Sequence, residues 1–465
     1  MAVYGAKTGK VEPFGTEHIP ASERHGGPFR LFTLWFASNV TIGSYAVGYL
    51  AVSAFGLPLG YAIISLLLAN VLAGVLLGLA CAMGPSMGYP QMMISRATFG
   101  RRGGYLPAVL QWASSVGWFS VNAVLGAFAL SELTGIGYPE AAIVLVSLMA
   151  LLGIFGHNLI HAFEKIMSLV LGIFFAFATV FLFLDSGKII HYAPTVTQSS
   201  IYFLPYLVLL AGASLSYLMS WAPYASDYSR YLPSSTSRRK AALFTFLGGT
   251  LASLWFEILG AVVAASVYAT AHNPASVTIT GSLLTVLGPL GLGALAAIVL
   301  GSLSANALNI YTSGLAFLVL DVRLKRWMAV LLGGFIGGLL ALIVGSSFTS
   351  FYEGFLLLLD YWVAPWLAIT LIDFYVFGRK DPEHVRGAPP IKYAGMLSYL
   401  IGIAVSIPFI SWSYSTLSYT GYISSHLLHG ADISYYVALG VTSVLYYLLS
   451  RRIYGERRLI TTVPD

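Results

Sequence analysis

The chain has few charged residues. Only 9% of its 465 residues are Asp, Glu, Lys or Arg, whereas 57% are apolar. A soluble domain carries about 25% charged residues, so this chain lacks the polar side chains needed to cover a water-facing surface of ordinary size. The formal charge of +6 does not indicate nucleic acid as a partner, because the basic residues gather in loops between apolar segments. The composition predicts a protein that spans the lipid bilayer many times.

Cysteine is nearly absent, and enzyme motifs are missing. Cys81 is the single cysteine and lies in an apolar segment, which excludes disulfide frameworks and cysteine metal sites. The sequence contains neither a Gly-x-x-x-x-Gly-Lys-Ser/Thr phosphate loop nor a His-Glu-x-x-His helix. His157 and His161 are four residues apart, but no cysteine or acidic cluster joins them. We therefore predict no enzyme, no ATP-driven pump, no metal site and no cofactor.

Long apolar runs make up most of the chain. Because a transmembrane helix needs about 20 mainly apolar residues, the sequence predicts an all-α integral membrane protein with twelve spans. The predicted segments are 30–55, 59–83, 105–133, 140–156, 162–184, 202–224, 241–268, 289–320, 327–346, 349–377, 393–411 and 433–450. Residues 1–28 are charged and have no apolar core, so no secretory signal peptide is predicted.

The basic residues predict the orientation. When the twelve segments are threaded through a membrane, all Lys and Arg except Lys188 fall on one side. Because cytoplasmic loops are enriched in Lys and Arg, we expect both the N-terminal tail (1–29) and the C-terminal tail (451–465) in the cytoplasm. An even number of spans agrees with this orientation. We expect a monomer in the cell (inner or plasma) membrane.

The twelve segments divide into two sets of five and a final pair. Segments one to five cover 30–184, and segments six to ten cover 202–377. An odd number of spans in each set makes the second set cross the membrane in the opposite sense. This inverted repeat is typical of secondary transporters, whose sites lie at mid-membrane. Segments eleven and twelve (393–450) are expected at the periphery.

The first segment of each set is interrupted by polar or helix-breaking residues. Segment one contains Asn39-Val40-Thr41-Ile42-Gly43-Ser44, and segment six contains Gly212 to Ser216, then Ser220 and Pro223. Unpaired backbone is tolerated at membrane depth only where it faces protein or a cavity. Two breaks in corresponding positions indicate a transport site.

Segments three and six carry aromatic and amide side chains suited to a flat ligand. Trp118 and Asn122 are four residues apart and share one helix face. An indole plane can stack on a ring, and an amide can both donate and accept hydrogen bonds at its edge. Trp221 precedes Pro223 and offers a second plane. The alternative is that both indoles pack in the bundle and Asn122 bonds a neighbouring helix.

Polar and acidic residues at membrane depth are further candidates for binding a ligand or an ion. Asn306 and Asn309 follow Ser304 in segment eight, where they could bind a ligand or bond neighbouring helices. Glu257 in segment seven and Asp360 in segment ten are intramembrane carboxylates, which often serve as proton relays. Either carboxylate could instead be a neutral, hydrogen-bonded acid.

Several of these stretches together resemble one family. The matching motifs are Leu34 to Ala37, Phe99 to Gly103, Trp118 to Asn122, Ala225 to Pro233, Asn306 to Asn309 with Tyr311, and Tyr361-Trp362. In this order they resemble the nucleobase–cation symporters, which comprise cytosine/purine permeases and hydantoin/allantoin transporters. The stretches around Trp221 and Asn306 are more similar to the cytosine/purine branch.

The resemblance implies a fold and a set of site residues. The family has the ten-helix inverted repeat of the amino-acid/sodium symporters plus two helices. By position, Trp118 and Trp221 would sandwich the substrate ring, Asn122 and Asn309 would bond its edge, and Thr41 and Asn306 would lie beside it. The family's sodium ligands would correspond to Ala37, Val40, Gly301 and Ser304, with a further hydroxyl at position 305. Ala305 has no hydroxyl, so the coupling ion stays open between Na⁺ and H⁺.

The predicted function is secondary active transport. We expect import of a planar nucleobase of the cytosine, purine or uracil type, with a proton or sodium ion, by alternating access. Alternatives are a hydantoin, allantoin or thiamine-like vitamin transporter of the same architecture and, more remotely, a channel.

Overall fold

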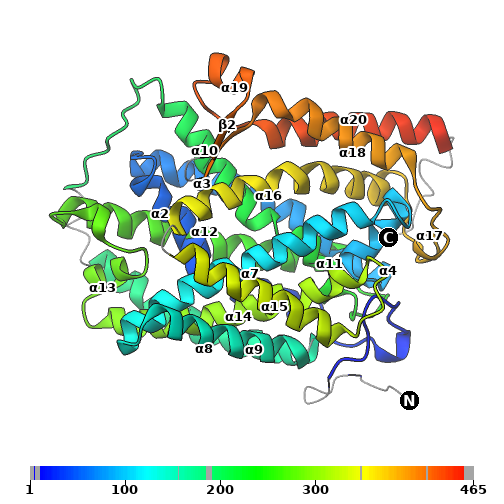
Figure 1. The fold of residues 1–465 in the computed structure, drawn as a ribbon, viewed down its shortest axis with the longest axis horizontal. Coiled ribbons are helices and arrows are strands. Elements are labelled where there is room, and N and C mark those ends of the chain that lie inside the picture. The colour runs from blue at the N-terminus through cyan, green and yellow to red at the C-terminus, as the bar shows by residue number, and fades with distance from the viewer. Residues whose placement is uncertain are drawn as a thin grey trace.

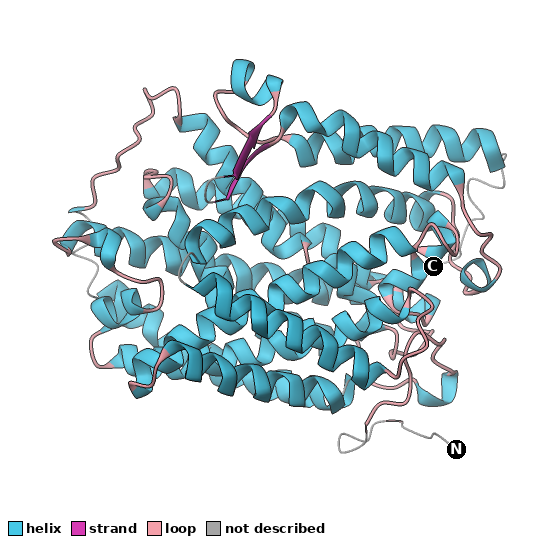
Figure 2. Ribbon diagram, viewed as in Figure 1, coloured by secondary structure: helices cyan, strands magenta, loops and turns pink. Residues whose placement is uncertain are grey.

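The computed structural model describes residue 5 and residues 11–155, 157–184, 191–345, 348–414 and 417–454. These residues are helical except for loops and one antiparallel hairpin, β1 (Ser411–Tyr414) and β2 (Leu417–Thr420), in which Ser411 pairs with Thr420 (Figure 2). Lys188, most of the first ten residues and the end of the C-terminal tail lie outside the described residues.

Long helices run side by side through the molecule (Figure 1). Those of the first predicted set are α1 (Phe29–Asn39), α2 (Ile42–Ser53), α3 (Leu59–Cys81), α7 (Tyr105–Thr134), α8 (Tyr138–Phe155) and α9 (His157–Leu184). Those of the second set are α10 (Phe203–Met219), α11 (Ala225–Ser229), α12 (Arg238–Thr270), α14 (Leu290–Leu318), α15 (Arg326–Val344) and α16 (Phe348–Leu371). The last long helices are α18 (Tyr393–Ser406) and α20 (Ser434–Tyr454).

Short helices connect these elements. They are α4 (Gly84–Met87), α5 (Gln91–Ile94), α6 (Arg96–Phe99), α13 (Gly281–Leu287), α17 (Glu383–Arg386) and α19 (Tyr422–Leu427). A π-helical turn over Ile372–Val376 extends α16. Residues 11–25 and the C-terminal end of α20 lie at the same end of the bundle, on the right in Figure 1.

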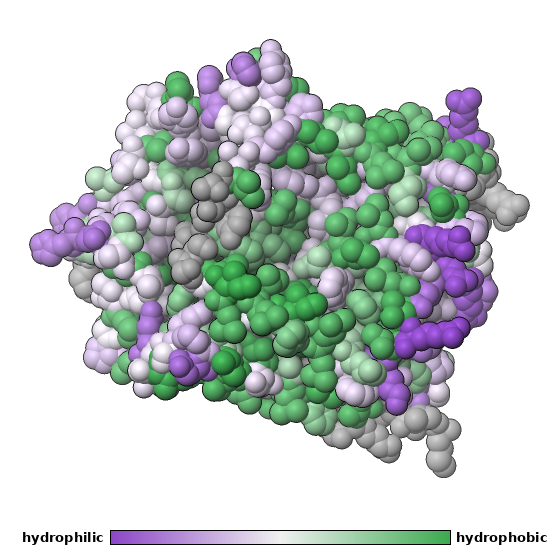
Figure 3. Space-filling view, in the orientation of Figure 1, coloured by the Kyte–Doolittle hydropathy of each residue, from purple (hydrophilic) through white to green (hydrophobic). Residues whose placement is uncertain are grey.

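Nine helices in the described part of the chain are long and apolar enough to cross a membrane. They correspond to predicted segments two to ten. Segment one consists of two short helices, segment eleven is a shorter apolar helix (Tyr393–Phe409), and the tyrosine-rich α20 is not among the nine. Figure 3 shows hydrophobic residues over the middle of the molecule and the most hydrophilic residues toward its ends, as a membrane-embedded bundle requires.

The predicted break in segment one is confirmed. The chain leaves the helical conformation at Val40 and Thr41, where Thr41 is extended with φ −137° and ψ 160°. Helix α1 ends directly before these two residues and α2 begins directly after them. The polar run in the sequence therefore marks a real interruption of the first span.

The predicted break in segment six is confirmed at Ser220 and Pro223 but not at Gly212 to Ser216. Helix α10 continues through Gly212 and Ser216 to Met219, so the prediction of a break there is wrong. Gly212 instead allows close packing, because a Cβ atom on it would lie 2.5 Å from the Tyr435 hydroxyl. The α-helix ends at Met219, and a 3₁₀ turn containing Pro223 leads into α11. Proline interrupts the helix because it has no amide N–H to donate.

The central helices pack as pairs around these breaks. Helices α7 and α14 pack along each other, and α12 packs against α1, α2 and α3. Helix α10 contacts α3 and α16. Helices α18 and α20 pack together and against α16, at one edge of the bundle (Figure 1). The two breaks are thus enclosed by protein, as backbone at membrane depth requires.

Candidate functional site

The two breaks contact each other through side chains. The indole Nε1 of Trp221, beside the second break, donates a hydrogen bond to Asn39 Oδ1 at the end of α1 (3.2 Å). The hydroxyls of Thr41 and Tyr217 are 3.0 Å apart. These contacts join positions separated by more than 170 residues. The backbone interruptions predicted from sequence therefore form one central region.

Trp118 lies in an aromatic box next to this region. Its ring makes edge contacts with Tyr217 of α10 at a centroid distance of 5.4 Å and with Phe355 of α16 at 5.3 Å. Tyr352 of α16 is 6.3 Å away. The Nε1 atom of Trp118 is buried and has no hydrogen-bond partner in the described structure. A buried donor without a partner is costly, so this indole is well suited to bind a ligand acceptor.

The box includes residues that the sequence did not indicate. Tyr217, Tyr352 and Phe355 are ordinary aromatic residues of apolar helices, and nothing local distinguishes them from core residues. In the described structure no direct ring contact joins Trp118 and Trp221; Trp221 instead packs edge-on against Trp35 and Tyr224. Both indoles are linked to the stretch Asn39–Thr41: Trp221 bonds Asn39 directly, and Trp118 packs against Tyr217, whose hydroxyl bonds Thr41.

The three predicted amides have different environments. Asn122 Nδ2 donates to the Trp118 carbonyl oxygen (3.0 Å) within α7. Asn306 Nδ2 donates to the Phe119 carbonyl oxygen (2.8 Å) and so joins α14 to α7, which is the helix-bonding alternative. Asn309 Nδ2 donates to Asn306 Oδ1 (3.0 Å), whereas its own Oδ1 is buried without a partner in the described structure. Asn309 therefore retains an acceptor for a ligand.

The residues expected around the cation lie where α14 passes the first break. A Cβ atom on Gly301 would lie 3.3 Å from the Val40 carbonyl oxygen, so the glycine lets α14 approach the break closely. The Ala37 carbonyl accepts a hydrogen bond from the Val40 amide (3.3 Å). One turn further along α14, the Ser304 hydroxyl donates to Glu164 Oε2 (2.7 Å).

Glu164 is a buried carboxylate that sequence reasoning missed. It is fully buried in α9, and its Oε1 atom has no partner in the described structure. The predicted fifth segment began at 162, which placed Glu164 at the membrane boundary next to Lys165. Because α9 begins at His157, Glu164 lies about two turns inside the helix and faces α14. A charged residue within an extended apolar pattern was the only available signal.

The two predicted carboxylates differ in their partners. Glu257 accepts hydrogen bonds from Asn70 Nδ2 (2.6 Å), Ser214 Oγ (2.7 Å) and Ser253 Oγ (3.0 Å). It thereby ties α12 to α3 and α10, as expected of a buried, satisfied acid. Both oxygens of Asp360 are buried without a partner in the described structure, so Asp360 lacks the stabilising contacts that Glu257 has.

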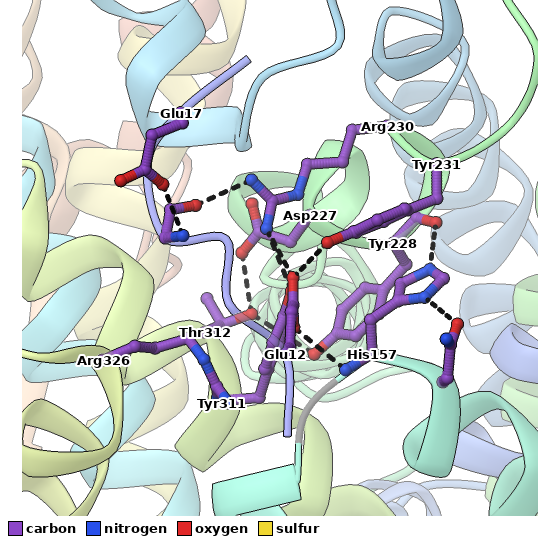
Figure 4. Close-up of polar contacts among 12 residues, drawn as sticks. Glu12, Glu17, His157, Asp227, Tyr228, Arg230, Tyr231, Tyr311, Thr312 and Arg326 are labelled. Atoms are coloured by element: carbon purple, nitrogen blue, oxygen red, sulfur yellow. Dashed lines mark hydrogen bonds and ion pairs between the residues drawn. The ribbon is translucent and has the colours of Figure 1, made fainter. Parts of the chain in front are cut away.

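The end of the bundle nearest the N-terminal tail is closed by a buried cluster around Glu12 (Figure 4). Glu12 Oε1 pairs with Arg230 Nη2 at 3.0 Å, and both side chains are fully buried. The same oxygen accepts hydrogen bonds from the hydroxyls of Tyr231 (2.5 Å) and Tyr311 (3.1 Å). Glu12 Oε2 accepts from the His157 amide (3.1 Å). One tail carboxylate thus joins α9, the chain after α11, and α14.

Asp227 extends this closure without pairing to Arg230. Its Oδ1 accepts a hydrogen bond from the backbone N–H of Gln91 (2.8 Å), and its Oδ2 accepts one from the Thr312 hydroxyl (2.8 Å). Asp227 therefore joins α11 to α5 and α14. We call Glu12, Arg230, Tyr231, Tyr311 and the His157 amide the tail latch.

A third acidic residue, Asp321, lies at the same end, between α14 and α15. Asp321 forms ion pairs with Arg96 (2.7 Å) and Arg101 (3.1 Å) and accepts a hydrogen bond from the Tyr105 hydroxyl (2.6 Å). Partial burial by itself raises the pKa of Asp321, but the hydrogen bonds from Arg96, Tyr105 and Arg101 outweigh it and lower the pKa to about 2. Asp321 stays ionised at any physiological pH.

Comparison with known proteins identifies the family. Residues 18–438 match the family described as permeases for cytosine/purines, uracil, thiamine and allantoin. The chain belongs to this permease family. It is 31% identical over 461 residues to YxlA of Bacillus subtilis (strain 168), named as a candidate purine-cytosine permease, with 95% of this chain and 96% of YxlA covered. The predicted family, in its cytosine/purine branch, is confirmed.

A fungal relative and a solved structure agree with this assignment. The purine-cytosine permease fcyB of Emericella nidulans is 28% identical over 468 residues, covering 94% of this chain and 88% of fcyB. The closed structure of Mhp1, a nucleobase-cation-symport-1 family transporter with bromovinylhydantoin bound, superposes with a TM-score of 0.75 at 17% identity and 95% coverage of both chains. This permease therefore has an all-helical, Mhp1-like transporter fold and is not an enzyme.

Proposed function

We propose that this permease imports a planar nucleobase of the cytosine, purine or uracil type by cation-coupled symport. The observation that carries the proposal is the pair of unpartnered buried groups, Trp118 Nε1 and Asn309 Oδ1, beside an aromatic box and the broken helices. A nucleobase has ring nitrogens, carbonyls or amines at its edge that can satisfy a donor and an acceptor, and a flat face that packs against aromatic rings. The names of YxlA and fcyB support the same substrate class.

The proposed architecture is the 5+5 inverted repeat with twelve spans. In such a repeat α1, α7, α8 and α9 correspond to α10, α14, α15 and α16. The contacts between helices agree with this correspondence: α1 packs on α9 and α10 packs on α16, while α7 packs on α15 and α14 packs on α8. Likewise α9 contacts α14 as α16 contacts α7. The divided α1–α2 pair, α18 and α20 would complete twelve spans. The positive-inside rule supports cytoplasmic termini, which puts the tail latch at the cytoplasmic end.

The coupling cation is proposed to bind where the first break meets α14 and α9. The carbonyls of Ala37 and Val40, Gly301 and the Ser304 hydroxyl support this location, and Glu164 adds a buried carboxyl group next to Ser304. A buried carboxylate without a neutralising partner is very costly, so Glu164 would either face a bound cation or take up a proton, and both Na⁺ and H⁺ stay open as coupling ions. Substrate and cation drive transport if both favour the same conformational state.

The substrate site is tested by uptake into proteoliposomes. Radiolabelled cytosine, adenine, uracil and allantoin are offered, with sodium and pH gradients imposed separately. Loss of one base–aromatic stacking contact costs about 1–3 kcal/mol, so Trp118→Ala should weaken substrate binding roughly 5- to 150-fold. Asn309→Ala should weaken it several-fold. Trp412→Ala is the control, because Trp412 bonds the Gly354 carbonyl beside the hairpin. Normal uptake in both site variants contradicts the proposed site.

The coupling residue is tested by separating binding from accumulation. Glu164→Gln keeps the size of the side chain and an acceptor for Ser304 but removes the charge. We expect it to bind nucleobase while losing uptake driven by the ion gradient. Glu257→Gln is the matched control, since Glu257 is already fully hydrogen-bonded, and Asp360→Asn tests the second unpartnered carboxylate. Gradient-driven accumulation by Glu164→Gln at the wild-type level would exclude Glu164 from coupling.

A further inference from the structure

A basic cavity lies at the same end of the bundle as the tail latch. Its volume is about 370 Å³, and it is enclosed by the tail, the start of α1 and the start of α9. The polar residues lining it are His25, Arg30, Thr33, Asn158, His161 and Lys165. The volume is many times the roughly 30 Å³ that one water occupies in the liquid, so the cavity can accept a substituted phosphate.

The charge of this cavity is uniformly positive. Arg30 projects from α1 and Lys165 from α9, and no Asp or Glu is among the lining residues. Among the residues that the structure describes, neither Arg30 nor Lys165 forms an ion pair. Arg and Lys bind phosphate oxygens through strong, charge-assisted hydrogen bonds. His25 and His161 lie alongside, so the cavity has the chemistry of a phosphate site.

An apolar track leads from the cavity along the outside of α9. Phe29 is 57% exposed, and Ile166 and Leu169 on α9 are 57% and 64% exposed. The track continues over Val170, Ile173 and Phe177, at spacings that keep them on one helix face. In a membrane this face contacts acyl chains. A ligand with a phosphate next to hydrocarbon chains therefore fits both parts.

We propose that this cavity binds the phosphate headgroup of an anionic glycerophospholipid of the cytoplasmic leaflet, with its chains along α9. Basic pockets between helices at the cytoplasmic side are suited to such headgroups. The phosphate would bridge Arg30 and Lys165 and so hold α1 against α9. His25, in the same cavity, bonds Asn158 Oδ1 (3.2 Å), which also contacts His157 of the tail latch. The bound lipid therefore favours the state in which the latch is closed.

The experiment measures lipid binding to the purified full-length protein. The protein in detergent is titrated in three separate arms with mixed micelles that contain phosphatidylglycerol, with mixed micelles that contain phosphatidylcholine, or with inorganic phosphate alone. Bound lipid is counted by native mass spectrometry. The test variant is Arg30→Gln with Lys165→Gln. The matched control is Arg239→Gln with Lys240→Gln, which removes two exposed positive charges at the start of α12. Each basic residue near an anionic headgroup contributes about fivefold in affinity, so the test variant should lose about thirtyfold.

The outcomes separate a lipid site from other readings. We expect the wild type and control to prefer phosphatidylglycerol over phosphatidylcholine and the test variant to show no preference. A preference retained by the test variant overturns the proposal. Displacement of phosphatidylglycerol by millimolar phosphate also overturns it, because the site would then bind a free anion. If the test variant does not fold, the wild type is instead cross-linked with a photoreactive phosphatidylglycerol. The proposal requires cross-links on α1 and the start of α9, and cross-links elsewhere overturn it. Nucleobase binding is measured separately and does not depend on this result.

Discussion

Replacing Glu12 with glutamine should open the tail latch. Glu12 lies only a few residues from the N-terminus, yet its carboxylate is fully buried and contacts groups from three parts of the bundle. Glutamine keeps the size but loses the charge that neutralises Arg230. It also places an amide N–H₂ donor at a position where the carboxylate oxygens accept four hydrogen bonds. The Gly15 carbonyl, which accepts from Arg230 Nη1 (2.8 Å), would be left as the nearest partner for the guanidinium.

The size of the effect follows from the burial of both charges. Removing one partner of a buried ion pair costs about 3–5 kcal/mol, because the other charge stays uncompensated. The tail can leave its position without unfolding the helices. The free-energy cost of the unpaired Arg230 charge should therefore destabilise the latched state relative to the unlatched state. Since about 1.4 kcal/mol is a factor of ten, the unlatched population should rise by about 100- to 4,000-fold.

Hydrogen–deuterium exchange measures this change locally. Exchange rates of protected amides report the free energy of the opening that exposes them. Peptides covering 11–25 and the start of α9, including the His157 amide, should exchange about 100- to 4,000-fold faster in Glu12→Gln. Glu17→Gln is the control, because Glu17 lies in the same tail but is exposed. Equal exchange in the two variants would refute the reasoning that Glu12 holds the tail.

Two further predictions concern stability. Gly48→Ala should destabilise the fold by about 3 kcal/mol or more, because its Cβ atom would lie 1.7 Å from the Glu257 carbonyl oxygen; Gly440→Ala, with no atom within 4 Å of the new Cβ, should be neutral or stabilising in thermal unfolding. Asp321 has a folded pKa of about 2, below its ordinary value of 3.8, so its stabilising effect is complete above about pH 4 and is lost as the pH falls toward 2. Unfolding curves of Asp321→Asn should therefore show a weaker pH dependence in that window, and an unchanged dependence would contradict the assigned ion pairs.

Local patterns in the sequence predicted part of the candidate site. Trp118 stood out because it shares a helix face with Asn122, and Asn309 stood out with Asn306 because amides at membrane depth are costly unless satisfied. The run from Asn39 to Ser44 marked the first break. Ser220 and Pro223 marked the second break, but the prediction wrongly extended it to Gly212 and the serines after it, because these residues are typical of broken helices. In the structure the glycine accommodates Tyr435, and the Ser214 and Ser216 hydroxyls bond neighbouring helices.

The sequence by itself determined that the chain is a many-span, helical membrane protein, and it indicated the family and the first break. These properties depend on hydropathy, charge bias and residues within a few positions of one another. Only the tertiary structure decided that Glu164 meets Ser304, that Glu12 pairs with Arg230, and that Arg30 and Lys165 share a cavity. The physical reason is distance along the chain. Each of these contacts joins residues more than a hundred positions apart, and it is the packing of helices that brings these side chains together.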